Sequence, residues 1–120
     1  MHQYKELNIW KKSVELGTSI YKLTKQFPAD ERFGLISQMR RATVSVSSNI
    51  AEGAGRKSNK EFSQFLSISY RSLCELDTQL IISTNLGYLE EDELVQYSNR
   101  IVELQKMIFS LIKKLNREKG

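Results

Sequence analysis

The chain contains a single proline, Pro28, and its apolar residues recur at spacings of three and four along almost its whole length. Proline breaks helices, and this spacing places side chains on one face of a helix rather than on one face of a strand. Strand-like alternation of apolar and polar residues is rare. The sequence therefore predicts an all-α fold, with helices over about residues 8–27, 31–53, 58–86 and 91–117.

Short segments with turn chemistry separate the expected helices. Pro28 cannot continue the first helix, and Asp30 is a residue type that caps the next one. Ser58 opens a capping-box pattern, and Gly87 supplies the left-handed conformation that often ends a helix. Four helices joined by turns this short favour an antiparallel, up-down-up-down four-helix bundle, with residues 1–120 as one domain.

The third and fourth helices carry a second apolar stripe beside the one expected in the core. Its members are Phe65, Ile68, Ile82, Val95, Val102, Phe109 and Ile112. A helix that is apolar over this width needs partners on two sides. Either a tightly packed single bundle covers both stripes, or the second stripe joins copies of the chain. We expect the second case, a homo-oligomer.

The net charge is +4, and it is distributed unevenly. Residues 1–60 carry 11 Lys and Arg against 5 Asp and Glu, whereas residues 61–120 carry 7 against 9. Such an asymmetry favours polyanion binding or charge-directed self-assembly, although a merely solvated face is the commoner cause of charge bias.

Nothing in the sequence predicts secretion or a membrane anchor. The apolar runs are far shorter than the roughly 20 residues that span a bilayer, and the first residues lack the apolar region of a signal peptide. Cys74 is the only cysteine, so the chain has no internal disulfide. A cytoplasmic location and no membrane partner are therefore expected.

The segment EGAGRKSNK, residues 52–60, has the composition of a phosphate-binding loop but not its pattern. Such a loop places glycine directly before Lys-Ser and follows a strand, whereas here Arg56 precedes Lys57 and a helix comes before. His2 is the only histidine, which excludes a Ser/His/Asp set and a Glu-x-x-His metal pair. Cys74 is expected to be a buried small apolar residue. The sequence predicts no enzyme, no metal and no cofactor.

The second helix carries a polar stripe for which two interpretations remain. One is an internal network, in which arginines pair with carboxylates and fix the helix register. Its predicted members are Gln38, Ser45, Asn49, Glu52 and Glu75. The other is a surface whose guanidinium and ammonium groups hold phosphates. Its predicted members are Arg56, Lys57, Lys60, Arg40, Arg41, Lys11, Lys12, Lys22 and Lys25. The network is favoured for Arg40 and Arg41, and phosphate contact for Arg56, Lys57 and Lys60.

Three segments, YKELNIWKKSVEL, QMRRATVSVSSNIAEGAGR and SNKEFSQFLSISYRSLCELDTQL, resemble the four-helix-bundle family encoded within intervening sequences of bacterial 23S ribosomal RNA genes. The same family includes accessory proteins of diversity-generating retroelements. The resemblance implies an antiparallel bundle that assembles into a ring-like homo-oligomer, commonly a pentamer, with a basic surface suited to nucleic acid. In the retroelement relatives that surface serves binding to reverse transcriptase and nucleic acid.

Two positions depart from the family's pattern. Ser47 stands where the family usually has proline, so the second helix should be more continuous. Arg71 stands where the family usually has glycine, which adds bulk and charge at a place where helices approach closely.

We therefore predict a non-enzymatic homo-oligomer that binds structured nucleic acid, ribosomal RNA or its intervening sequence, through a basic surface. Affinity would come from phosphate neutralisation. Because few exposed aromatic residues are expected beside the basic ones, duplex or folded RNA is favoured over single strands. The alternative is a protein-interaction scaffold, such as a reverse-transcriptase accessory protein.

Overall fold

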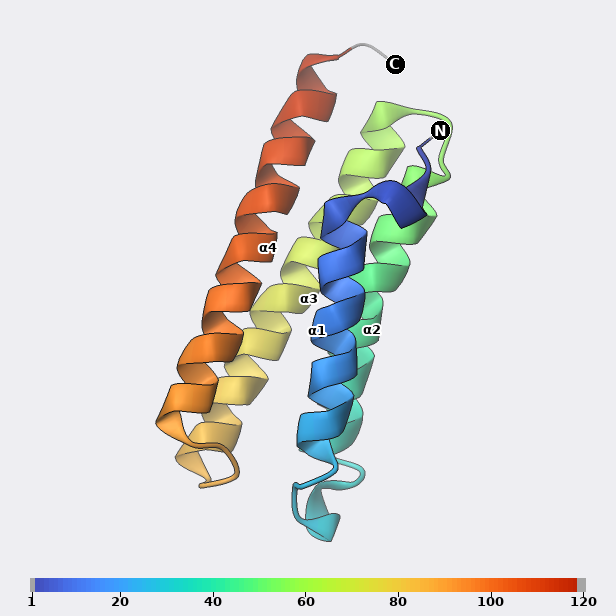
Figure 1. Ribbon diagram of the computed structural model, residues 1–120. Coiled ribbons are helices and arrows are strands. Elements are labelled where there is room, and N and C mark those ends of the chain that lie inside the picture. The colour runs from blue at the N-terminus through green and yellow to red at the C-terminus, as the bar shows by residue number, and fades with distance from the viewer. Residues whose placement is uncertain (1, 119–120) are drawn as a thin grey trace.

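The computed structural model describes residues 2–118 (Figure 1), so residues 1, 119 and 120 of the predicted domain lie outside it. Over this range the chain forms α-helices and two short 3-10 helices, without a strand. The elements are η1 (Tyr4–Glu6), α1 (Asn8–Thr24), η2 (Ala29–Glu31), α2 (Leu35–Ala54), α3 (Asn59–Asn85) and α4 (Glu91–Arg117). The predicted all-α fold with four helices is confirmed.

The segment between α1 and α2 differs most from the sequence-based expectation. Helix α1 ends at Thr24 rather than near residue 27, and α2 begins at Leu35 rather than near residue 31. Pro28 has no backbone N–H and disfavours helical conformation in the residue before it, so the chain leaves the helix early. Asp30 does not cap α2, whose N-cap residue is Gly34; the Glu31 Oε1 atom accepts from the Leu35 N–H at 3.2 Å.

The other helix ends follow the predicted turn chemistry. The Ser58 Oγ atom accepts from the Glu61 N–H at 3.2 Å, which satisfies an orphan donor at the start of α3. Gly87 adopts a φ of 83°, and the Tyr88 N–H donates to the Ser83 carbonyl at 2.9 Å. Gly87 therefore ends α3 in the left-handed conformation, as expected.

Helix α2 packs against α1 and α3, α3 packs against α4, and a narrower contact joins α1 to α4. Figure 1 shows the α1–α2 and α3–α4 connections at one end and the α2–α3 connection at the other. All four helices supply fully buried side chains. The largest include Leu16, Ile20, Met39, Ile50, Phe62, Leu66, Leu73, Leu76, Ile101, Leu104 and Ile108. One core therefore runs the length of the molecule.

Helices α2 and α3 approach closely near the turn that joins them. A Cβ atom on Gly53 would lie 2.7 Å from the Cβ atom of Phe65 and 2.9 Å from Cδ1 of Phe62. Glycine is needed here for the space it leaves. Helix α2 is unbroken through Ser47, as expected without proline. Among the described residues, no helix has the length and apolar character needed to cross a membrane.

Candidate nucleic-acid interface

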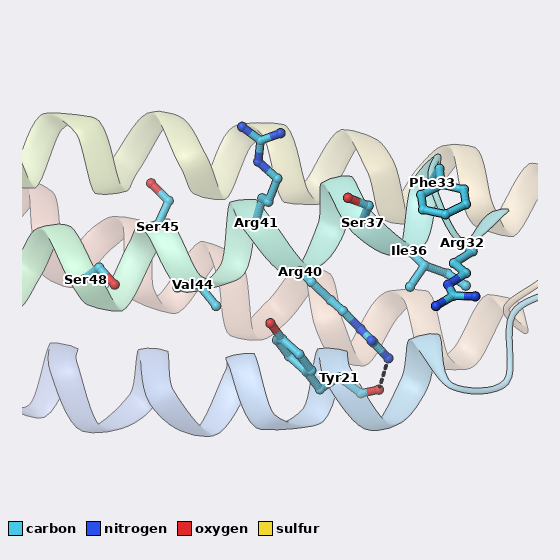
Figure 2. A pocket seen from close by; sticks show the side chains of 10 residues that line it. All are labelled: Tyr21, Arg32, Phe33, Ile36, Ser37, Arg40, Arg41, Val44, Ser45 and Ser48. Atoms are coloured by element: carbon cyan, nitrogen blue, oxygen red, sulfur yellow. Dashed lines mark hydrogen bonds between the residues drawn. The ribbon is translucent and has the colours of Figure 1, made fainter.

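A hollow of about 680 Å³ lies along the outward face of α2, close to the α1–α2 turn (Figure 2). Ten residues of the described chain line it, and none of them is acidic. They include three arginines, Arg32, Arg40 and Arg41, and two aromatic residues, Tyr21 and Phe33, with serine and aliphatic side chains between them. We call this site the arginine hollow. Its lining carries positive charge that no carboxylate of the same lining offsets.

Arg40 lies on the side of α2 that faces α1 (Figure 2). Its Nε atom donates to Thr24 Oγ1 at 3.0 Å, and its Nη2 atom donates to the Tyr21 carbonyl at 3.2 Å. The guanidinium carbon also lies 4.6 Å from the centroid of the Tyr21 ring. Arg40 therefore hydrogen-bonds a backbone carbonyl in the last turn of α1 and joins α1 to α2. The expected partners of Arg40 were Glu52 and Glu75, and this expectation is wrong.

Arg41, the next residue, points to the other side of α2 (Figure 2). It is exposed, and it lines both the arginine hollow and a second hollow of about 670 Å³ toward α3. Gln38 and Glu75 line the second hollow with it, but within residues 2–118 Arg41 forms no ion pair or hydrogen bond. Its five donors are therefore available to a ligand.

The predicted polar network exists only in part. Ser45 and Ser72 share a hydrogen bond of 2.9 Å between their Oγ atoms, and the Asn49 side chain donates to the Ser45 carbonyl at 2.8 Å. The first of these contacts joins α2 to α3, and the second lies within α2. Gln38 is exposed, and Glu75 receives only a long contact of 3.5 Å from Gln79 on its own helix.

Ser72 takes part in this network although it was not among the predicted members. A second such serine is Ser69, whose Oγ atom donates to the Val46 carbonyl at 2.8 Å. The signal for both lies in the sequence, since they are serines three positions apart on a helix whose neighbour carries Ser45 and Ser48 at the same spacing.

The turn after α2 and the first turn of α3 present two unpaired lysines rather than three unpaired basic groups. Arg56 forms an ion pair of 2.9 Å with Glu52, and its guanidinium carbon lies 4.7 Å from the Phe65 ring centroid. Lys57 and Lys60 are exposed and form no ion pair with any other described residue. Most of the positive charge that this turn offers to a ligand therefore comes from the two lysines.

The lysines of α1 also divide into two groups. Lys12 Nζ lies 3.1 Å from Glu103 Oε1, an ion pair that joins α1 to α4. Lys11, Lys22 and Lys25 are exposed and unpaired within the described part of the chain. Among the predicted phosphate-binding residues, Arg40, Arg56 and Lys12 are therefore held by contacts within the molecule, and the others face solvent.

The expectation that few exposed aromatic residues accompany the basic ones is wrong. Phe33 is 87% exposed and Tyr21 is 40% exposed, and both line the arginine hollow. The Arg32 guanidinium carbon lies 5.5 Å from the centroid of the Phe33 ring. The sequence predicts that Phe33 lies in the second helix, so the exposure of this ring was not expected. In the structure it lies in the turn before α2, outside the helix periodicity.

Much of the second apolar stripe is open to solvent. Val95 is 55% exposed, Val102 is 45% exposed and Phe109 is 56% exposed. Ile82 is also exposed, whereas Phe65, Ile68 and Ile112 are half-buried. The chain on its own therefore does not cover this stripe. Arg71 is exposed and lines a hollow between α3 and α4 together with Phe109.

Cys74 is exposed rather than buried, which corrects the expectation from its leucine neighbours. Leu73 and Leu76 lie on the buried face of α3. Cys74 lies outside that face, beside α4. Its Sγ atom accepts from the Gln105 side chain at 3.3 Å. Among residues 2–118, no group of three or more His, Cys, Asp and Glu residues is placed to hold a metal ion.

The chain is similar to known proteins over most of its length. A family model described as 23S rRNA-intervening sequence protein matches residues 5–110. A crystal structure from Bacteroides thetaiotaomicron VPI-5482, described as a protein with unknown function from the S23 ribosomal protein family, superposes with a TM-score of 0.81. The two chains are 24% identical, and the match covers 88% of this chain and 95% of the other. At this identity the likeness shows the fold alone. The comparison with curated proteins gives no match.

Proposed function

The chain belongs to the 23S rRNA-intervening sequence protein family, and on this basis we propose that it is a non-enzymatic cytoplasmic protein that binds structured nucleic acid. Ribosomal RNA or intervening-sequence RNA is the proposed ligand. The observation that carries the proposal is the arginine hollow, because three arginines line it without a carboxylate. A polyanion gains most where positive charge is not already neutralised by the protein.

The proposed interface follows α2 from one end to the other. Arg32 and Arg41 lie at or near its start, and Lys57 and Lys60 lie in or just beyond the turn after its end. Helix α2 is roughly 30 Å long, which is comparable with one turn of a nucleic-acid duplex. Arg41 can hold a phosphate with two parallel N–H donors, whereas the lysines act as point charges. Neutralised phosphates release counterions, so affinity should fall steeply as salt rises.

We further propose that the chain forms an antiparallel bundle that assembles into a homo-oligomer, with a pentamer as the expected state. The exposed side chains of Val95, Val102 and Phe109 support assembly, since they form an apolar row on one face of α4. Each copy would then present its own α2 face. Several linked faces on one RNA would raise the overall affinity without any new kind of contact.

The test is fluorescence anisotropy of a folded rRNA-type stem-loop at about 50 and 200 mM salt, the range in which phosphate-dominated binding changes steeply. The double variant Lys57→Ala/Lys60→Ala should bind more weakly, and the slope of log K against log salt should fall by about 1 for each phosphate that the protein no longer neutralises. The matched control is Lys113→Ala/Lys114→Ala, which removes the same charge from exposed positions on α4. Equal weakening by both double variants would contradict an interface on α2.

A second candidate function is a protein-interaction scaffold, with a reverse transcriptase as one class of partner. The observation that favours it is the exposed apolar row on α4, because RNA offers little apolar surface to cover Val95, Val102 and Phe109. A protein that binds no stem-loop at low salt, but keeps its assembly, would favour this function over nucleic-acid binding.

A further inference from the structure

Phe33 is the most exposed large apolar side chain of the described residues, at 87%. It lies in the turn before α2 and lines one end of the arginine hollow (Figure 2). It belongs neither to the buried core nor to the half-buried side chains packed against it. The fold therefore gains little from this ring, and a ligand that covers it would remove its apolar surface from water.

We propose that the arginine hollow holds an unpaired nucleotide of the bound RNA, with the base stacked on Phe33 and the adjacent phosphate held by Arg41 and Arg32. The inference rests on the proposed function and narrows it, because it names an unpaired residue within the structured RNA as the feature that is recognised. A bulge or a loop supplies such a residue.

The charge of the hollow favours a phosphate over other occupants. Arg41 has no partner within residues 2–118, and the side chain of Arg32 contacts the Phe33 ring rather than a carboxylate. Arg40 is held in place by Thr24 and the Tyr21 carbonyl, so its charge is fixed at the side of the hollow without being neutralised. A site with fixed positive charge and no acidic lining is organised for an anion before the anion arrives.

The remaining lining fits the other parts of a nucleotide. Ile36 and Val44 offer apolar contact, and Ser37 and Ser48 offer hydroxyl groups that both donate and accept hydrogen bonds. The volume of about 680 Å³ lies within the range of small-molecule sites. A phosphate, a ribose and a base can therefore each meet a suitable group here.

The aromatic ring is the reason for choosing an unpaired nucleotide rather than a duplex. In a duplex both faces of each internal base are covered by its neighbours, so Phe33 could not stack on them. RNA-binding proteins that stack aromatic side chains on bases do so with bases that have left the stack. The arginines alone would hold the phosphates of paired and unpaired RNA equally well.

The experiment compares two RNAs that differ in one nucleotide. One is a fully paired duplex, and the other is the same duplex with a single bulged 2-aminopurine, whose fluorescence is quenched by stacking. The protein should bind the bulged RNA about tenfold more tightly and change the fluorescence of the bulged base, an effect of the size expected for one stacked base. The variant Phe33→Leu, which keeps an apolar side chain but lacks the ring, should bind both RNAs equally.

The matched control is Phe109→Leu, because Phe109 is an exposed phenylalanine outside the hollow. It should retain the preference for the bulged RNA. The variant Arg41→Gln should weaken binding to the bulged RNA and lower the salt slope by about 1, whereas Phe33→Leu should leave the slope unchanged. This difference separates the stacking contact from the phosphate contact.

Four outcomes would overturn the inference. A Phe33→Leu variant that still prefers the bulged RNA would exclude stacking on this ring. A change in sedimentation of Phe33→Leu would show that a second copy of the chain covers the hollow. Equal wild-type binding to both RNAs would overturn the inference but leave the proposed function standing, provided that Lys57→Ala/Lys60→Ala weakens that binding. Binding to neither RNA would overturn both.

Discussion

Helix α2 turns arginines and serines toward solvent, whereas α4 turns Val95, Val102 and Phe109 toward it. Both helices are amphipathic, and both bury an apolar seam in the same core. Their outward faces differ in chemistry, and the proposed functions assign them to different partners. Charged and hydroxyl groups are stable in water and attract a polyanion, while an apolar row loses free energy in water until another apolar surface covers it. The proposed functions therefore assign the face of α2 to a charged ligand and the face of α4 to a protein.

The largest expected effect comes from comparing a buried residue of α4 with an exposed one. Ile108 is completely buried and its neighbour Phe109 is 56% exposed. Ile108→Ala should lower the free energy of unfolding by about 2–5 kcal/mol, because it leaves a cavity in the core. Phe109→Ala should change the stability of the single chain by less than about 0.5 kcal/mol. Urea unfolding of the two variants measures both values, and a similar loss in each would show that the second stripe is part of the core.

A smaller effect is expected where α2 meets α3. Gly53→Ala places a Cβ atom against Phe65 and Phe62 and should destabilise the protein by about 1–3 kcal/mol through overpacking. The control is Gly55→Ala in the following turn, where φ is −84° and the nearest atom that a Cβ would meet lies at 3.6 Å. That change should be neutral or slightly stabilising. Thermal unfolding measures the difference, and an equal response at both glycines would argue against the close approach of α2 and α3.

The contrast between the two outward faces is tested most directly by a pair of equally exposed valines. Val102 on α4 and Val44 on α2 are each 45% exposed. Val102→Asp should raise the dissociation constant of the proposed oligomer at least tenfold, since it brings a charge into an apolar contact. Val44→Asp should instead weaken RNA binding by about tenfold at low salt, because it adds a carboxylate to the arginine hollow. Both variants should keep the fold.

Sedimentation and fluorescence anisotropy on the same two variants give the result. Each variant should change one measurement and leave the other almost unaffected. If Val44→Asp dissociated the oligomer, or Val102→Asp abolished RNA binding, the two faces would not be separate sites.

The sequence predicts the helices and their apolar stripes. It does not predict which individual side chains are exposed and which contact another helix. The apolar periodicity predicts the four helices. It also predicts the exposed stripe on α4, because each residue of that stripe follows a residue of the core stripe by one position. Arg40 and Arg41 could not be separated in this way, because they are adjacent and chemically identical. Whether either one reaches another helix depends on how α2 crosses α1. The Thr24 hydroxyl that Arg40 contacts lies 16 positions earlier in the chain.

Phe33 shows a second limit of the sequence. Its surroundings depend on where α2 begins, and the end of a helix is the least certain part of a periodic pattern. A shift of the first residue from near 31 to Leu35 moves Phe33 from a helix face into an exposed turn. The aromatic ring and the arginines of the hollow therefore come together only in the folded chain.

The smallest expected effect concerns a hydrogen bond that joins the two regions at one end of the molecule. The Tyr88 hydroxyl, in the turn before α4, donates to Glu31 Oε2, in the turn before α2, at 3.0 Å. This hydrogen bond, with some burial and the nearby charges of Glu31 and Asp30, raises the pKa of Tyr88 above its ordinary value of 10.0. The folded state therefore favours the neutral phenol.

The sign of the pH dependence follows from this direction. A group whose pKa is raised on folding contributes stability below its unfolded pKa, about 10 for tyrosine, and loses that contribution as the pH rises through the folded value. Tyr88→Phe should therefore unfold at a slightly lower temperature than the wild type at pH 7, and the difference should shrink above about pH 10. Thermal unfolding of both proteins between about pH 7 and pH 11 measures this difference directly, so the titration of the other tyrosines and the lysines cancels. A difference that stayed constant over this range would mean that the bond between the turns of α2 and α4 does not depend on the Tyr88 proton.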